Sequence, residues 1–201
     1  MADDPGDDSD QRRSFRVDDV LPLAYRIRDS HLMDAAATAP TAAVPSSDPF
    51  DLTPALNRMR QDFVLLHAEA ERVSPTVARY LQLLDHKVGL MLQTLLMQQL
   101  EREDQAGPRP VNIGADGVSF PVLESIAEGA FIELRLLLPD LASGLSLTGR
   151  VTRCEPQDDI HLLAVHFVGL QDYQRDLLVH HTLRRQRQLL RARRDTDTGS
   201  A

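Results

Sequence analysis

Apolar and polar residues alternate in several short segments of this chain, and that alternation constrains its fold more than any other feature. It is the pattern of β-strands that each bury one face. The segments lie at residues 21–28, 111–112, 118–120, 132–138, 145–151 and 163–167. Short strands separated by Gly, Pro and Asp turns are typical of a small antiparallel barrel or sandwich. After the last strand segment, Tyr173, Leu177 and Leu178 follow a helical spacing, which predicts a final helix from about Asp172.

The stretch between the first two strand segments has a different character. Residues 29–50 are rich in Ala, Pro, Ser and Thr without periodicity, which indicates a linker. Thr53-Pro54 is a helix start signal, and Ser74-Pro75 repeats it. Gly107-Pro108 ends the helical pattern. We therefore predict a helical insertion over 51–106, built either as two helices or as one long kinked helix.

The predicted insertion carries an apolar stripe at spacings of three and four residues, the period of a helix with one apolar face. Further leucines lie outside this stripe between residues 81 and 100, so the second helical part is apolar around most of its girth and needs more than one neighbour. We predict that copies of the chain associate here, against the alternative of a helical hairpin folded onto its own barrel. The expected interface residues are Met59, Phe63, Leu66, Val77, Tyr80, Leu84, Val88, Met91 and Leu95.

Composition and charge exclude several classes of protein. The net charge of -8 disfavours attraction to nucleic acid or to anionic membranes. The most apolar window, 81–100, contains Asp85, His86 and Lys87 and is too polar to insert in a membrane. The single cysteine, Cys154, fits a reducing compartment. Residues 1–11 are acidic, and we expect both this tail and residues 195–201 to lie outside the folded domain. We expect a soluble, cytoplasmic protein.

Catalytic and metal-binding signatures are missing from the sequence. The seven histidines are scattered, and they lack cysteine or acidic partners at the spacing of metal ligands. The sequence contains neither a nucleophile elbow nor a phosphate loop. We therefore predict a protein that is not an enzyme and uses no metal or cofactor. The arginines between 184 and 194 lack interleaved aromatic residues, so we interpret them as a solvated helix end rather than a nucleic-acid site.

Two short motifs carry the candidate chemistry. RRSFR places Arg12 and Arg16 four residues apart, directly before the first strand. NIGADG begins the second block of strands and contains Asn112, Gly114 and Gly117. The planar guanidinium of arginine forms paired hydrogen bonds with phosphate groups and with guanine edges. On its residues alone, RRSFR is equally consistent with a solvated basic arm.

The order of the two motifs resembles the signature of the PilZ domain, RxxxR followed by (D/N)xSxxG. EGA at 128–130, LTGRVTRCE at 147–155 and AVHFVGL at 164–170 extend the resemblance, which covers residues 12–28 and 110–194. It implies an α+β fold, a small antiparallel barrel with a C-terminal helix, and a site for cyclic di-GMP at the arginine motif and the barrel surface. It also implies an adaptor role in motility, pilus or biofilm control through an unidentified protein partner. The residues it places near the ligand are Arg12, Arg16, Asn112, Gly114 and Gly117.

The chain departs from this pattern in two ways. Gly114 stands where the family has Ser, which removes one hydroxyl worth about 1 kcal/mol to a ligand and implies weak binding. Gly117, the last glycine of the motif, matches the family and is expected to permit a backbone turn that a larger residue could not adopt. The second departure is the insertion, which is similar to a xanthomonad variant of the family whose long helices form a tetramer and whose barrel is judged unable to bind nucleotide. That resemblance favours a tetramer, and it leaves open a purely structural oligomeric module as the alternative function.

Overall fold

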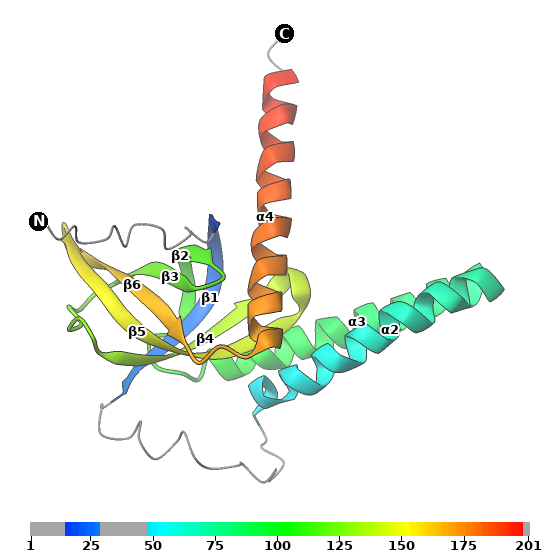
Figure 1. Cartoon of the computed structure of the whole chain (residues 1–201), viewed down its shortest axis with the longest axis horizontal. Helices are drawn as coiled ribbons and strands as arrows, with labels where there is room; N and C mark the ends of the chain where they lie inside the picture. The colour runs from blue at the N-terminus through cyan, green and yellow to red at the C-terminus, as the bar shows by residue number, and fades with distance from the viewer. Residues whose placement is uncertain (1–14, 29–47, 199–201) are drawn as a thin grey trace, which may run out of the picture.

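The computed structural model describes residues 15–28 and 48–198, and its centre is a closed barrel of six antiparallel strands (Figure 1). The order around the barrel is β1-β2-β3-β6-β5-β4, and each neighbouring pair is antiparallel. The predicted α+β fold is confirmed. The strands are β1 (Arg16–Arg28), β2 (Gly107–Gly114), β3 (Gly117–Val122), β4 (Phe131–Leu138), β5 (Ser143–Gln157) and β6 (Ile160–Val168).

β1 closes the barrel because it pairs with two strands in succession. Its first half pairs with β2, from Arg16 opposite Gly114 to Leu23 opposite Gly107. Its second half pairs with β4 as far as Arg28 opposite Phe131. Alternate residues of all six strands point inward and form one core, as the alternation predicts. The largest fully buried side chain of this core is Phe120.

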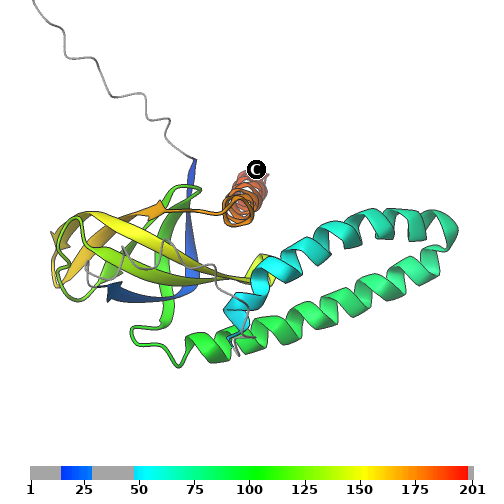
Figure 2. The same ribbon diagram turned by 60° about the horizontal axis from the view of Figure 1, so that its bottom comes forward.

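The insertion folds as two helices that run antiparallel. A short 3-10 helix η2 (Pro49–Leu52) leads into α2 (Thr53–Val73), and α3 (Pro75–Leu100) follows. Ser74 breaks the helix because its backbone is extended, with φ -154 and ψ 100, as expected for a residue before proline. The resulting hairpin extends well away from the barrel (Figure 2). Of the two predicted alternatives, two separate helices are therefore correct.

The base of the hairpin docks on the outside of the barrel. Phe50, Leu96 and Leu100 form a second apolar cluster with Ala24 and Leu137 of the sheet. A Cβ on Gly144 would lie 2.7 Å from Leu96 Cδ2 and 2.8 Å from the Phe50 ring, so a glycine makes room for both side chains. Phe50 was expected to end the linker, and its burial corrects that boundary. The rest of the predicted linker lies outside the described residues.

Two further boundaries differ from the prediction by a few residues. β2 begins at Gly107 rather than at 110, because Gly107 still pairs with Leu23. The last helix, α4 (Asp172–Thr198), begins where expected but runs past 194. Its first half packs Leu177 and Leu178 into the barrel core, and its C-terminal end projects away from the barrel (Figure 1). A one-turn helix η3 (Pro139–Leu141) joins β4 to β5. Across the described ranges, no helix is long and apolar enough to cross a membrane.

Candidate functional site

The predicted ligand residues gather on the outer surface of β1, β2 and β3, near the start of β1. We call this surface the arginine–glycine face. Strand alternation turns its six residues outward, and the register places Arg16 beside Gly114, and Asp18 beside Asn112, which in turn faces Ser119. The face comprises Arg16, Asp18, Asn112, Gly114, Gly117 and Ser119.

The Arg16 side chain runs from β1 across β2 and reaches β3. Its Nη1 donates a hydrogen bond of 3.3 Å to Ser119 Oγ. A Cβ on Gly114 would lie 2.9 Å from Arg16 Cγ, and a Cβ on Gly117 would lie 3.0 Å from Arg16 Nη2. The two glycines therefore form a floor without side chains, over which the arginine extends.

The close approach of neighbouring atoms explains both glycines of the motif. At Gly117 a Cβ would lie 2.4 Å from the Val165 carbonyl oxygen of β6, which no backbone adjustment within a paired strand relieves cheaply. Gly117 does not have a positive φ, so the expected reason, a special backbone turn, is wrong. At Gly114 a Cβ would also meet the Phe15 carbonyl oxygen at 3.0 Å. Gly114 is thus required by the path of the chain around Arg16.

Asn112 is held by its neighbour on β1. Its Nδ2 donates a 2.8 Å hydrogen bond to Asp18 Oδ1. This bond orients the amide and places a carboxylate two residues from Arg16 on the same face. The arginine–glycine face therefore combines one exposed cation, one carboxylate, one amide and one hydroxyl, which can hydrogen-bond to a polar anionic ligand.

Helix α4 borders this face and makes ion pairs with residues next to it. Arg175 Nη1 lies 2.7 Å from Asp116 Oδ1 in the β2–β3 turn. Asp19 lies where α4 covers β1, and there Arg185 Nε approaches its carboxylate at 3.1 Å and His181 Nε2 at 3.3 Å. The two arginines of α4 that approach the face are thus already paired with carboxylates.

His181 is the most deeply buried ionisable group of this region, with 1% of its surface exposed. Neither ring nitrogen makes a well-aligned hydrogen bond to a described residue, and the contact with Asp19 is one of proximity. Burial lowers the pKa of His181 from its ordinary value, while the Asp19 carboxylate opposes that effect. The imidazole is therefore kept neutral and packed where α4 meets β1.

The structure brings together Arg16, Asn112, Gly114 and Gly117 from the predicted ligand set. Arg12, the fifth, lies outside the described residues. Sequence reasoning missed Ser119, although its outward position follows from the alternation in β3. It also missed the buried partnership of Asp19 with α4, for which the only sequence signal is an acid at an inward position of β1.

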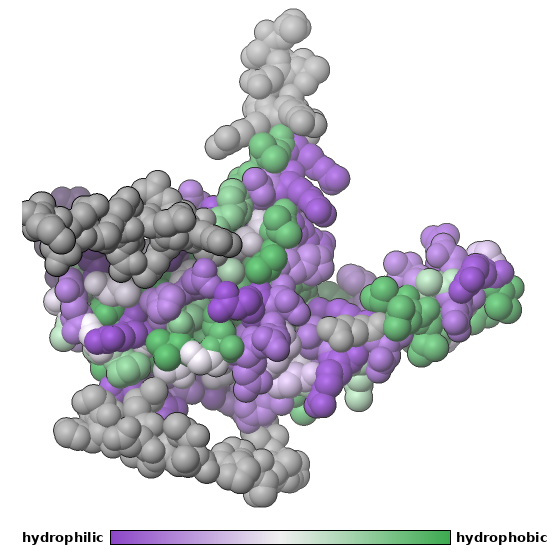
Figure 3. Space-filling view, in the orientation of Figure 1, coloured by the Kyte–Doolittle hydropathy of each residue, from purple (hydrophilic) through white to green (hydrophobic). Residues whose placement is uncertain are grey.

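The predicted interface residues lie on the hairpin, and most of them share one apolar face. A helix turns by about 100° per residue, and the antiparallel arrangement puts the stripe of α2 and the stripe of α3 on the same side of the hairpin. Met91 and Tyr80 are 68% and 63% exposed. Figure 3 shows apolar side chains gathered along the projecting part of the hairpin. The apolar face comprises Met59, Leu66, Val73, Val77, Tyr80, Leu84, Val88, Met91 and Leu95, all of them exposed.

The contact between α2 and α3 uses other residues, many of them small or polar. Ala78 is buried, whereas the side-chain position of Gly89 faces Ala142 after η3 rather than α2. Phe63, which was expected in the interface between copies, is instead half-buried and stacks on His67, with 5.4 Å between ring centroids. The hairpin thus pairs its two helices through a modest contact and leaves its most apolar surface in water.

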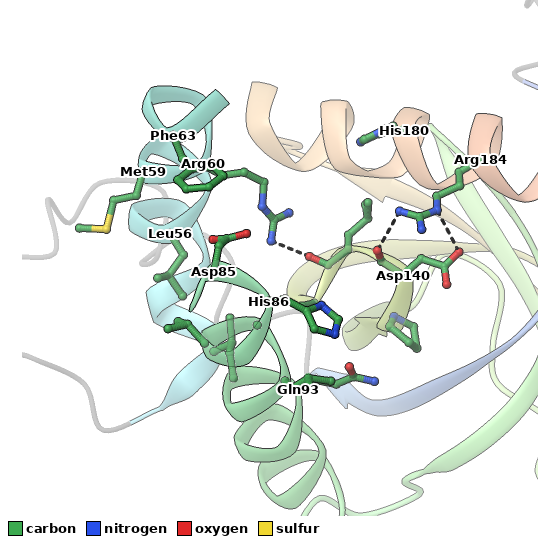
Figure 4. A pocket seen from close by; sticks show the side chains of 17 residues that line it. Leu56, Met59, Arg60, Phe63, Asp85, His86, Gln93, Asp140, His180 and Arg184 are labelled. Atoms are coloured by element: carbon green, nitrogen blue, oxygen red, sulfur yellow. Dashed lines mark hydrogen bonds and ion pairs between the residues drawn. The ribbon is translucent and has the colours of Figure 1, made fainter. Parts of the chain in front are cut away.

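A cavity of about 520 Å³, lined by both apolar and charged side chains, lies where the hairpin, η3 and α4 meet (Figure 4). Arg60 Nη2 donates a 2.7 Å hydrogen bond to the Leu141 carbonyl oxygen, and Arg184 Nη1 donates one of 3.1 Å to the Asp140 carbonyl oxygen. Asp85 and His86 of α3 also line it. These contacts join η3 to α2 and to α4. The cavity is separate from the arginine–glycine face.

Comparison with known proteins gives a match to one domain family. Residues 89–184 match the family model of the PilZ domain. No curated protein matches the chain.

Two solved structures are similar to this chain, one over most of its length and one over less than half of it. The first is a pathogenic protein from Xanthomonas campestris, described as a tetrameric PilZ domain self-assembled via an unusual helical bundle. It is 17% identical, with a TM-score of 0.52, and the similarity covers 89% of this chain and 92% of that chain. The second is the Bacillus subtilis inhibitor of motility, MotI/DgrA, 18% identical over 42% of this chain and 44% of that one, with a TM-score of 0.36. Residues 89–184 thus match the PilZ domain, and the six-stranded barrel shares the fold of the Xanthomonas campestris structure.

Proposed function

We propose that the chain is a PilZ adaptor protein whose copies assemble through the helical hairpin. The observation that carries this proposal is the apolar face, a row of exposed side chains that includes Tyr80, Leu84 and Met91. Apolar surface of this extent on a projecting element is typical of an interaction site. Two such faces, pressed together, bury both rows and form a four-helix core.

A second copy of the chain is the occupant that this surface fits best. Leu65, Leu83 and Leu90 are also exposed and lie outside the apolar face. A pair of hairpins therefore retains apolar surface on which a second pair can pack. The Xanthomonas campestris protein is described as a tetramer assembled through helices, and the likeness spans most of both chains. We therefore propose a tetramer.

The mass of the particle in solution tests this assembly. Light scattering at micromolar concentration should give about four times the chain mass of 22.4 kDa. Leu84→Glu and Met91→Glu should each lower the mass, because a charge would enter an apolar seam. Gln82→Glu adds the same charge about 200° away from Leu84 around the helix and should leave the mass unchanged. A wild-type mass of one chain would refute the proposal.

We further propose that the barrel binds cyclic di-GMP weakly and so couples assembly to motility, pilus or biofilm control through a protein partner. The observation in favour is Arg16, an exposed arginine extended over a glycine floor with a hydroxyl and an amide beside it. Its planar donors suit the phosphates and guanine edges of that ligand. The proposal describes a cytoplasmic receptor that is not an enzyme. The alternative remains a structural module that binds no nucleotide.

Calorimetry with purified full-length protein distinguishes the two. At low salt, cyclic di-GMP should bind, and added salt should weaken binding because the ligand carries two negative charges. Arg16→Ala and Arg12→Ala should each lower affinity by about tenfold or more, since each loses a charge-assisted hydrogen bond. Arg153→Ala removes an exposed arginine from β5 and is the matched control. Absence of heat with the wild-type protein would leave the structural module standing.

A further inference from the structure

Gly114 leaves the PilZ motif of this chain without its serine hydroxyl, and the structure shows another hydroxyl nearby. Ser119 lies on β3, one strand beyond Gly114, and faces Asn112 across the β2–β3 pair. It is half-buried, and its Oγ accepts the hydrogen bond from Arg16 Nη1. The hydroxyl therefore lies on the same outward surface as the motif residues.

Arg16 differs from the other arginines near this surface. Arg175 and Arg185 lie 2.7 Å and 3.1 Å from the carboxylates of Asp116 and Asp19. Within residues 15–28 and 48–198, the hydrogen bond of Arg16 goes to a neutral hydroxyl, and no carboxylate forms an ion pair with it. Its full charge and most of its five donors remain available to an anion.

We propose that Ser119 is a positioning residue of the nucleotide site, which holds the Arg16 guanidinium across the floor of Gly114 and Gly117. This inference rests on the proposed binding of cyclic di-GMP and assigns a part of the same site. A free arginine loses rotamer freedom when it binds a ligand. A hydrogen bond that already fixes its direction removes part of that cost before the ligand arrives.

The motif alone implies that Gly114→Ser, which restores the family serine, should strengthen ligand binding. The geometry around Arg16 predicts the opposite effect. A side chain on Gly114 would begin 2.9 Å from Arg16 Cγ and 3.0 Å from the Phe15 carbonyl oxygen. The arginine would have to leave its path, and its hydrogen bond to Ser119 would be lost. Gly114 and Ser119 therefore act as a pair, in which glycine opens the path and serine fixes its end.

Titration calorimetry with cyclic di-GMP tests the pair in the full-length protein. Ser119→Ala should weaken binding about fivefold, the effect of one ordinary hydrogen bond, and Ser119→Thr should restore it because the hydroxyl returns. Gly114→Ser should also weaken binding. In an Arg16→Ala background, Ser119→Ala should have no further effect. Ser125→Ala, at a serine whose side chain contacts Cys154 rather than Arg16, is the control.

The NMR signal of the Arg16 Nε–H group gives a readout that needs no ligand. Ser119→Ala should shift it and increase its mobility, whereas Ser125→Ala should leave it unchanged. If the wild-type protein binds no nucleotide but the signal responds to Ser119→Ala, the proposed receptor function fails and the positioning contact stands. If the protein binds and Ser119→Ala matches wild type, or Gly114→Ser tightens binding, the positioning role is overturned. An unresponsive signal overturns it as well.

Discussion

The barrel and the hairpin satisfy their side chains in opposite ways. The barrel is closed, so none of its six strands is left as an unpaired sheet edge, and its apolar side chains meet one another in a single core. The hairpin satisfies its backbone within its own helices, but it leaves a row of large apolar side chains, among them Tyr80 and Met91, in water. The contrast teaches that the barrel covers its own apolar side chains, while the hairpin leaves an apolar face that the proposed assembly would cover.

The largest difference in stability should appear when one large apolar side chain is truncated in each region. Phe120 is fully buried in the barrel, and Phe120→Ala should lower the free energy of unfolding by about 3–5 kcal/mol because it leaves a cavity. Met91→Ala on the hairpin should change the unfolding free energy of the dissociated chain by under about 0.5 kcal/mol. Urea titration followed by circular dichroism measures both. Equal losses in dilute protein would contradict the contrast.

Removing the hairpin should leave the barrel folded. Arg28 and Gly107 are separated by the five residues of β1 beyond Leu23, a span of about 17 Å that about ten Gly/Ser residues can bridge. Replacing residues 29–106 in this way should give a β-rich monomer, destabilised by about 2–3 kcal/mol because Leu137 loses its cover. Adding Leu137→Thr should improve its solubility. An unfolded product would mean that the hairpin contributes to the main core.

A smaller effect is expected at the polar contact that joins the two regions. Arg135 of β4 contacts Asp48 at 2.7 Å and Glu103 at 2.8 Å, and all three side chains are largely buried. Arg135→Met should cost about 1–2 kcal/mol, because two carboxylates lose their shared partner. Arg153→Met breaks a surface pair with Glu155 and should change stability by under about 0.5 kcal/mol. Thermal unfolding compares the two variants directly.

The smallest effect concerns pH and the junction of α4 with the barrel. The pKa of His181 is lowered by burial, so the unfolded chain takes up a proton at a higher pH than the folded one. Stability should therefore fall as pH drops below the ordinary histidine value of 6.5 toward the lowered pKa, by at most about 1.4 kcal/mol per pH unit. Asp19 faces the ring and opposes the shift. Urea titration of His181→Gln at several pH values should show a shallower slope, and an identical slope would refute this origin.

Much of this fold could be predicted from local pattern, and the exceptions have one cause. The strands follow from alternation, and the two helices follow from Thr53-Pro54 and Ser74-Pro75. The burial of Ala24 and Phe50 could not be predicted, because their cover comes from α3, far away in the sequence. In the site, the motif residues could be assigned, whereas the reason for Gly117 depends on a carbonyl of β6 that no local pattern reveals.

The double pairing of β1 also determines the order in which the chain can fold. β1 is made first, yet its partners β2 and β4 become available only after residues 107–114 and 131–138 have been synthesised. Contacts across such long loops form slowly, whereas a helical hairpin uses contacts close in sequence and forms early. On the ribosome, the hairpin can therefore fold before the barrel has closed, and under the proposed assembly it would be able to meet the hairpins of neighbouring nascent chains. Assembly would then precede folding of the domain that it serves, and chains from one message would tend to associate with one another.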